Sequence, residues 1–167
     1  MQILSYIESI NEWIGKCTMW FVYLLAAIIS YDVILRYVFS LPTLWVFDTS
    51  YTTFSFLFLL GLGYTQVKKG HVNVDLLISK YSPKGQALWR VIFYLFVILP
   101  FVAVILYYSL FFAIQSWKLW EESSMSTIGF PVYPLKTMLP IGFFFLLLQC
   151  FADFFRDLII VVKGGKS

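Results

Sequence analysis

The sequence predicts an all-α membrane protein with four transmembrane helices, amphipathic interfacial helices, and both termini in the cytoplasm. Of its 167 residues, 60% are hydrophobic and only 13% are charged, whereas soluble domains average about 25% charged residues. The mean hydropathy is +0.83. A soluble core cannot accommodate this apolar excess, so we expect residues 1–167 to form a single membrane domain whose surface largely faces lipid.

Four apolar stretches are long enough to cross the ~30 Å hydrocarbon core, which requires about 20 helical residues. They comprise approximately residues 13–35, 44–67, 86–117 and 137–162. The third is longer than a perpendicular helix needs, and Pro100 near its middle is the expected position of a kink. Ser82 and Pro83 are expected to provide its N-cap and first-turn proline, and Pro140 is expected in the first turn of the fourth span.

Two further segments have the pattern of interfacial helices. Residues 1–12 place Ile3, Ile7 and Ile10 at helical spacing, with acidic and amide side chains on other faces. This arrangement predicts an amphipathic helix at the cytoplasmic surface. Residues 71–82 are short, mixed in polarity and flanked by lysines. We expect them to lie along the membrane or against a partner.

The distribution of basic residues predicts the orientation. Nine of them fall on one side of the predicted spans: Lys16, Lys68, Lys69, Lys80, Lys84, Arg90, Arg156, Lys163 and Lys166. The other side has three: Arg36, Lys118 and Lys136. By the positive-inside rule the nine are cytoplasmic, which places both termini in the cytoplasm. The net charge of +3 is too small and too dispersed to indicate a nucleic-acid partner.

Charged residues are absent from the central parts of the predicted spans, which argues against an ion pathway through this chain alone. The exception is the pair Asp32 and Arg36, four residues apart near the outer end of the first span. Asp48, at the start of the second span, is the nearest alternative partner of Arg36. We interpret these three residues as a structural charge clasp between the first two helices, with a role in transport as the alternative.

Residues that would indicate catalysis or a cofactor are few. His71 is the only histidine, so a bis-histidine haem or a zinc site cannot be assembled within this chain. Glu121 and Glu122 form the only acidic doublet, and no nucleophile or metal motif accompanies them. We therefore expect a protein that is not an enzyme and that binds no cofactor or metal of its own.

The predicted span ends carry aromatic residues, as membrane–water interfaces do. Five tryptophans are expected to be interface anchors: Trp13, Trp45, Trp89, Trp117 and Trp120. The outer loop from Ser123 to Lys136 is either a rigid turn or a contact surface for a partner outside the membrane. Its candidate contact residues, with the acidic doublet before it, are Glu121, Glu122, Phe130, Pro131, Tyr133, Pro134 and Lys136.

Three segments are informative in their order and spacing. They are RYVFSLPTLW from Arg36, LLGLGYTQVKKGHVNVDLL from Leu59, and IGFPVYPLKTMLPIGFFFLLLQ from Ile128. Together with the four-span topology they resemble the small membrane subunit of tripartite ATP-independent periplasmic (TRAP) transporters. The family's Gly-x-His-Val/Ile-x-Val-Asp signature, in the cytoplasmic loop, is matched by Gly70, His71, Val72, Val74 and Asp75, and its Arg-Tyr-x-Phe signature by Arg36, Tyr37 and Phe39. Family members often carry paired acids after the tryptophan, whereas here Val46 and Phe47 precede the single Asp48.

The resemblance implies a three-part uptake system in the bacterial cytoplasmic (inner) membrane. A periplasmic substrate-binding protein would capture an organic acid, and a large membrane subunit would move it by a sodium-coupled elevator motion. Na⁺ is thus expected in the large subunit, and the small subunit would brace that subunit among the membrane lipids. The alternatives are a respiratory or redox membrane anchor, a small self-sufficient exporter and an intramembrane enzyme. A redox anchor would need paired histidines, an exporter would need a carboxylate in mid-span, and an intramembrane enzyme would need a polar catalytic set within the spans. The sequence does not supply them.

If Asp32 and Arg36 form a structural clasp, the substitution Arg36→Ala is expected to lower the yield of folded protein or complex. The reason is that the remaining carboxylate near lipid loses its counter-charge. The yield is measured by purification of the tagged chain from membranes. Normal assembly combined with abolished transport would instead favour the role in transport.

Overall fold

The computed structural model describes residues 2–41, 43–68, 81–124, 126 and 129–163. Its elements in chain order are α1 (Gln2–Val38), α2 (Val46–Val67), α4 (Pro83–Phe93), the π-helical turn η1 (Tyr94–Ile98), α5 (Leu99–Leu119) and α6 (Tyr133–Val162). Among these residues, the β-structure is an isolated bridge between Glu122 and Pro131. The expectation of an all-α protein is therefore confirmed.

Three helical stretches are long and apolar enough to cross a membrane: Leu4–Val38, Lys84–Leu119 and Tyr133–Val162. Helix α2 has 22 residues and is therefore about 33 Å long, which also matches the hydrocarbon core. It is not one of these three stretches, and its first three turns contain Asp48 and a series of Ser and Thr residues. The fourth span consequently remains a prediction.

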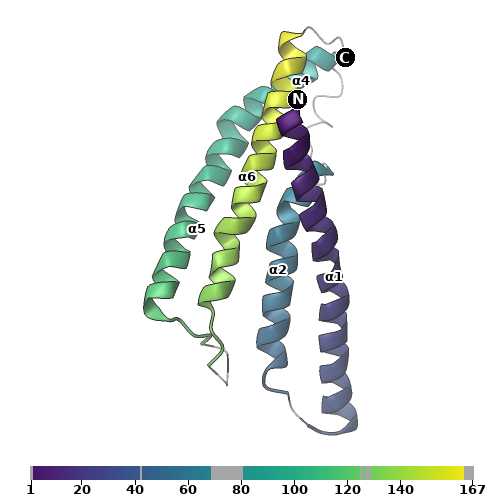
Figure 1. The fold of residues 1–167 in the computed structure, drawn as a ribbon, viewed down its shortest axis with the longest axis vertical. Helices are drawn as coiled ribbons and strands as arrows, with labels where there is room; N and C mark the ends of the chain where they lie inside the picture. Colours follow the sequence, from purple (N-terminus) through teal and green to yellow (C-terminus); the bar gives the residue numbers. More distant parts are fainter. Residues whose placement is uncertain (1, 42, 69–80, 125, 127–128, 164–167) are drawn as a thin grey trace.

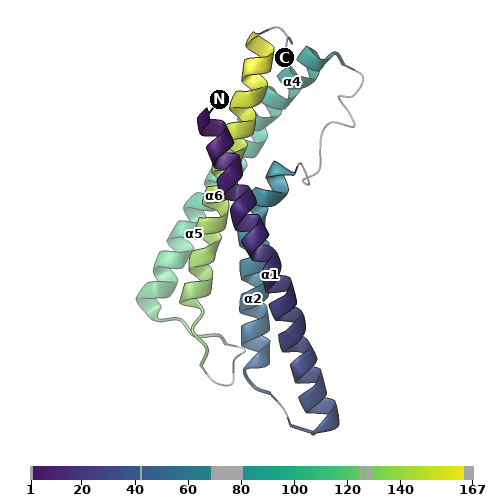
Figure 2. The same ribbon diagram turned by 45° about the vertical axis from the view of Figure 1, so that its right-hand side comes forward.

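The helices form two pairs that meet at one end of the molecule. Helix α1 lies beside α2, and α5 lies beside α6, while α6 also packs against α2 (Figure 1). The pairs diverge toward the lower end of Figures 1 and 2, where the outer loops lie. The start of α1 and the end of α6 share the opposite, upper end. This arrangement agrees with termini on one side, although which side of the membrane they face remains a prediction.

Helix α1 differs from the expectation of a separate interfacial helix over residues 1–12. The helix is continuous from Gln2 to Val38, which is 37 residues or about 55 Å. Between residues 2 and 38 the chain has no proline to end the helix. Asn11 is only 1% exposed and contacts α6, so this part of α1 is fixed by packing against another helix.

The third predicted span contains a π-helical turn next to Pro100, close to the position where we expected a kink. Ser82 is the N-cap of α4, as predicted, and its Oγ accepts a hydrogen bond from the amide of Gly85 at 3.3 Å. The π-helical turn η1 follows, in which the amide of Leu99 donates to the carbonyl of Tyr94. Pro100 comes directly afterwards and has no amide hydrogen to donate. The widened turn is a common way for a helix to absorb such an irregularity.

The start of α6 corrects another expectation. The helix begins at Tyr133, not near Thr137, so Pro134 occupies the first turn and Pro140 lies inside the helix. The outer loop explains the earlier start, because the amide of Val132 donates to the carbonyl of Glu121 at 2.9 Å. This bond fixes the chain immediately before Tyr133, and the sequence pattern does not reveal it.

Glycines allow the helices to approach closely at three places. A Cβ atom added to Gly142 of α6 would lie 2.5 Å from the backbone oxygen of Leu59 in α2. At Gly63 and Gly15 an added Cβ would lie 2.2 Å from Asn11 Oδ1 and from the ring of Tyr64, respectively. Small residues serve the same purpose in many membrane helix interfaces.

The substitution Gly142→Ala is expected to destabilise the fold by about 1–3 kcal/mol, the usual cost of overpacking a tight interface. Backbone atoms of α2 stand in the way, so a rotamer change cannot relieve the contact. Gly61→Ala is the matched control, because its added Cβ would meet no atom within 4 Å. Unfolding by SDS titration in detergent micelles would compare them. Equal stability of the two variants would contradict the close approach of α2 and α6.

Candidate functional site: a polar network between the helices

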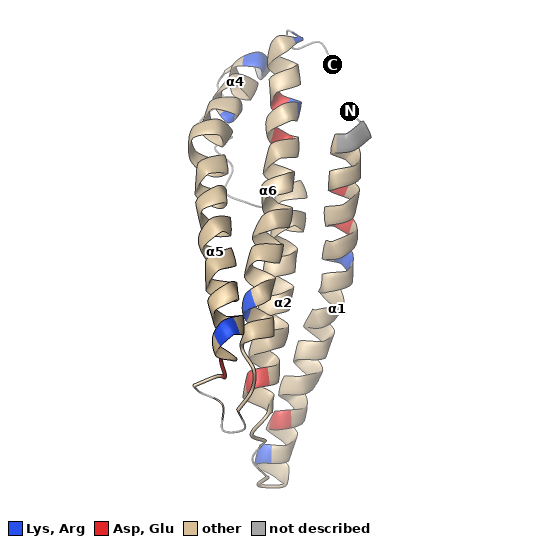
Figure 3. Ribbon diagram, turned by 60° about the vertical axis from the view of Figure 1, so that its left-hand side comes forward, with Lys and Arg blue, Asp and Glu red and all other residues tan. Residues whose placement is uncertain are grey.

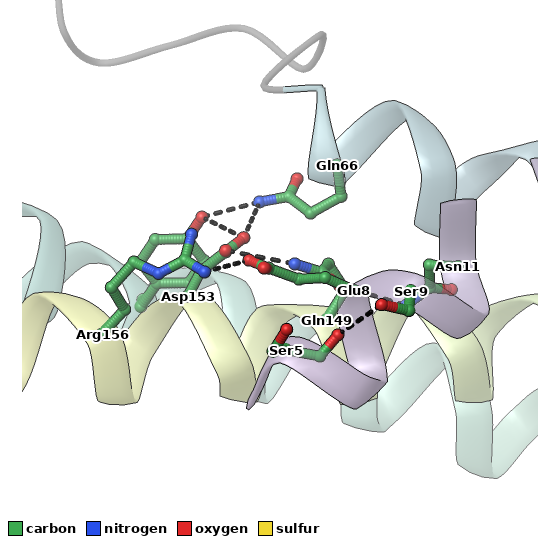
Figure 4. Close-up of polar contacts among 9 residues, drawn as sticks. Ser5, Glu8, Ser9, Asn11, Gln66, Gln149, Asp153 and Arg156 are labelled. Carbon is green, nitrogen blue, oxygen red and sulfur yellow. Dashed lines mark hydrogen bonds and ion pairs between the residues drawn. The ribbon is translucent and has the colours of Figure 1, made fainter. Parts of the chain in front are cut away.

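The carboxylate of Asp153, in α6, is the centre of a polar network between the helix pairs (Figure 4). Its Oδ2 accepts hydrogen bonds from Gln66 Nε2 of α2 at 2.8 Å and from the Tyr94 hydroxyl at 3.3 Å. Its Oδ1 accepts from Gln149 Nε2 at 3.2 Å. Gln66 Nε2 also donates to the Tyr94 hydroxyl at 2.7 Å. One carboxylate thus connects α2, η1 and α6.

The network continues into α1 through two buried amides. Asn11 Nδ2 donates to Gln149 Oε1 at 3.1 Å, and the two residues are 1% and 0% exposed. Gly63 makes room for Asn11, because any side chain there would overlap the Asn11 amide. Buried amides are stable only when hydrogen-bonded, so this contact fixes the register of α1 against α6.

Ion pairs surround the network and join α6 to α4 and to α1, and α1 to the end of α2. Arg90 Nε of α4 lies 3.0 Å from Asp157 Oδ2 of α6, with side chains 28% and 12% exposed. Arg156 pairs with Glu8 of α1 (Figure 4), and Lys68 pairs with Glu12. Such exposed pairs contribute little individually. The Arg90–Asp157 pair is the better shielded, and removing one of its partners would leave a poorly hydrated charge.

The network lies near one end of the apolar band. Gln66 is in the last turn of α2, a helix about as long as the hydrocarbon core is thick. A long stretch in the middle of α1, of α5 and of α6 carries no charged residue (Figure 3). We therefore expect the network to lie at the membrane boundary that the positive-inside rule predicts to be cytoplasmic.

Carboxylates in α2 and α6 are buried or half-buried in the structure, two of them inside the predicted fourth span (residues 137–162). Asp157 and Asp48 are 8% and 4% exposed, and Asp153 is half-buried within α6. Sequence reasoning did not single out Asp153 or Asp157, because partners of both lie on elements distant in the chain. One signal was available: Gln149 and Asp153 are polar residues four apart, on one face of the predicted fourth span.

The predicted charge clasp is divided in the structure. Arg36 Nη2 lies 2.8 Å from Asp32 Oδ2, and the hydroxyl of Thr43 donates to the other oxygen of Asp32. The pair therefore holds the end of α1 to the segment before α2. Asp48 instead accepts a hydrogen bond at 2.6 Å from the hydroxyl of Ser126, in the loop after α5. Asp48 is thus a contact between the two helix pairs.

The outer loop is tied to the ends of α5 and α6. Lys136 pairs with Glu121 and also lies 4.0 Å from the ring centre of Phe112. The hydrogen bond from Lys136 lowers the pKa of the Glu121 carboxyl. A lowered carboxyl pKa means that the contact stabilises the fold above the ordinary pKa and is lost as the pH falls through the lowered value.

Exposure differs among the predicted contact residues of the loop. The side chain of Lys136 is only 13% exposed, and Phe130 and Tyr133 are half-buried. Glu122, Pro131 and Pro134 are exposed. A pocket of about 400 Å³ separates the loop from α2; it is lined by Phe47, Tyr51, Glu121, Glu122, Ser123, Ser124 and Val132.

The predicted interface anchors are exposed in the structure. The exposed fractions of Trp13, Trp45, Trp89, Trp117 and Trp120 range from 42% to 68%. Trp117 Nε1 also donates to Thr137 Oγ1 at 2.8 Å, which joins α5 to α6. The cytoplasmic loop motif Gly70, His71 and Asp75 lies outside the described residues. Within the described ranges, no three His, Cys, Asp or Glu residues come together as metal ligands would.

These features define a helical membrane protein whose interior polar groups bind one another between helices. The family model for "Tripartite ATP-independent periplasmic transporters, DctQ component" matches residues 25–159. The chain therefore belongs to this family, the small permease component of TRAP transporters, as the sequence resemblance predicted. Among curated proteins, no sequence matches the chain. The alternative of a respiratory membrane anchor receives no support.

The importance of the network is tested by the substitution Gln66→Met, which keeps the length of the side chain and removes its donors. We expect the free energy of unfolding to fall by about 1–3 kcal/mol, because the Asp153 carboxylate loses a partner where little water is present. Gln115→Met is the matched control, since Gln115 is an exposed glutamine of α5. SDS titration measures both variants, and an equal effect would contradict a stabilising network.

Proposed function

We propose that this chain is the non-catalytic scaffold subunit of a sodium-coupled TRAP transporter that takes up an organic acid. In this role it braces a large elevator-type membrane subunit, which holds the Na⁺ and the substrate. The observation that carries the proposal is the polar network around Asp153, which connects α1, α2, η1 and α6 through hydrogen bonds. An elevator motion requires a part that remains fixed in the membrane while the transport domain moves.

The buried carboxylates support this proposal because each has a partner on another element. Asp157 pairs with Arg90 of α4, Asp48 accepts from Ser126 of the outer loop, and Asp153 accepts from two elements besides its own helix. Polar groups satisfied in this way specify one arrangement of helices. A transport pathway would instead require ionisable groups that exchange partners during the cycle.

The outer surface supports a contact with a periplasmic substrate-binding protein. The exposed Glu122 and Pro131 lie on a loop whose two arms are joined by backbone hydrogen bonds, from the amide of Ser123 to Phe130 and from the amide of Val132 to Glu121. The exposed Pro134 follows in the first turn of α6. Gly129 has a φ of +70°, a value that favours glycine. A pre-shaped loop of this kind loses little conformational freedom when it binds a partner.

Reconstitution into liposomes tests the proposal. We expect sodium-dependent uptake of organic acids only when this chain is combined with a large TRAP membrane subunit and a substrate-binding protein. Asp153→Leu is expected to reduce the amount of assembled complex, whereas uptake per assembled complex stays close to that of the unmodified protein. The assay follows radiolabelled organic acids, and size-exclusion chromatography measures assembly.

Two results would contradict the scaffold role. The first is uptake by liposomes that contain this chain alone. The second is an Asp153→Asn variant that assembles fully and no longer supports uptake, because that variant retains the shape of the side chain and loses its charge. The second result would make Asp153 part of the transport chemistry.

A further inference from the structure

A groove between α1 and α2 lies apart from the polar network. Its volume is about 500 Å³, and it is lined by Gly15, Thr18, Met19, Leu57, Phe58, Gly61, Leu62, Tyr64 and Thr65. The space above Gly61 is open, since an added Cβ would meet no atom within 4 Å. The hydroxyls of Thr18 and Thr65 donate to carbonyls of their own helices, at 2.7 and 2.9 Å. The groove therefore offers an apolar surface.

Positive charge lies at one end of this groove. In α2, Gly61, Tyr64 and Lys68 succeed one another at intervals of three or four residues, so Lys68 continues the groove-lining face beyond the helix end. Glu12 of α1 pairs with Lys68 and lies 3.9 Å from Lys16. Two ammonium groups thus share one carboxylate, and their side chains remain 67% and 51% exposed. A further anion would balance this charge.

The length of the groove matches one leaflet of a bilayer. From Leu57 to Lys68 the helix rises about 16 Å, at about 1.5 Å per residue. Half of the ~30 Å hydrocarbon core is about 15 Å. The lysines therefore lie at the depth of the head groups when Leu57 lies near the middle of the membrane.

We propose that this groove binds one acyl chain of an anionic phospholipid, with the lipid phosphate between Lys16 and Lys68. The lipid would come from the leaflet at the basic end of the protein, which is the leaflet predicted to be cytoplasmic. Apolar lining, open space, leaflet length and unbalanced positive charge together fit this ligand. Because all lipid tails are as apolar as the groove, the preference for an anionic phospholipid comes from close packing and from the contact between its phosphate and the lysines.

Native mass spectrometry of the full-length chain in detergent tests the proposal, with added phosphatidylglycerol, phosphatidylcholine or diacylglycerol. We expect phosphatidylglycerol to be retained best and diacylglycerol least. Lys16→Gln is expected to weaken phosphatidylglycerol binding about fivefold, the effect of about 1 kcal/mol per basic residue near anionic lipid. Lys84→Gln is the matched control, because Lys84 is an exposed lysine at the start of α4, on another element.

A second pair of variants tests the groove itself. Gly61→Leu is expected to fill the open space and to reduce lipid retention severalfold without loss of folding, which a melting curve verifies. Ala103→Leu is its control, since Ala103 is an exposed residue of α5. Equal retention of the three lipids, or equal retention by the two leucine variants, would overturn the proposal.

A photo-crosslinking amino acid at position 61 distinguishes the occupants in membranes where the complete transporter is expressed. A crosslink to phospholipid supports the proposal. A crosslink to the large membrane subunit would mean that a helix of that subunit occupies the groove, and the proposal would be wrong. The lipid assay uses this chain alone, so its outcome does not depend on whether the chain acts as a scaffold in transport.

Discussion

The hydrogen bonds to the Asp153 carboxylate are the constraint on which the arrangement of the helices depends. Donors reach this group from α2, η1 and α6, and Asn11 of α1 is attached through Gln149. Apolar contacts alone would permit several similar packings, because lipid competes equally well for apolar helix faces. A carboxylate that accepts directional hydrogen bonds permits far fewer packings, because sliding or rotating a helix would leave a donor or acceptor unsatisfied.

The depth that we predict for the network, near a membrane boundary, explains how a membrane would tolerate it. A charge near the bilayer centre is costly, whereas one near a boundary can reach water and head groups. Because α1 and α6 are longer than α2, Asp153 lies more than two turns before the end of its own helix and yet is level with the end of α2. The same level carries the Lys68–Glu12 pair, so polar contacts replace apolar ones where the apolar band ends.

Much of the fold follows from local sequence signals, and most of the site does not. The helical class, the N-cap at Ser82 and the irregularity near Pro100 depend on residues close together in the chain, which periodicity and proline chemistry describe well. The continuity of α1 and the early start of α6 depend on contacts with distant segments. The partners of Asp153 and Asp48 on other elements lie 59 or more residues away in the chain, so no local pattern could identify these contacts.

The two ends of the molecule are joined by different means, and this difference bears on a bracing role. At the basic end, side chains of four elements converge on one carboxylate and its amide neighbours. At the opposite end the helix pairs diverge, and a contact that crosses between them runs through the outer loop, from Asp48 to Ser126. A loop contact yields to displacement more readily than a packed helix interface. In the proposed scaffold role, the basic end would therefore be the rigid part of the frame, and the opposite end would have the greater freedom to adjust to a partner.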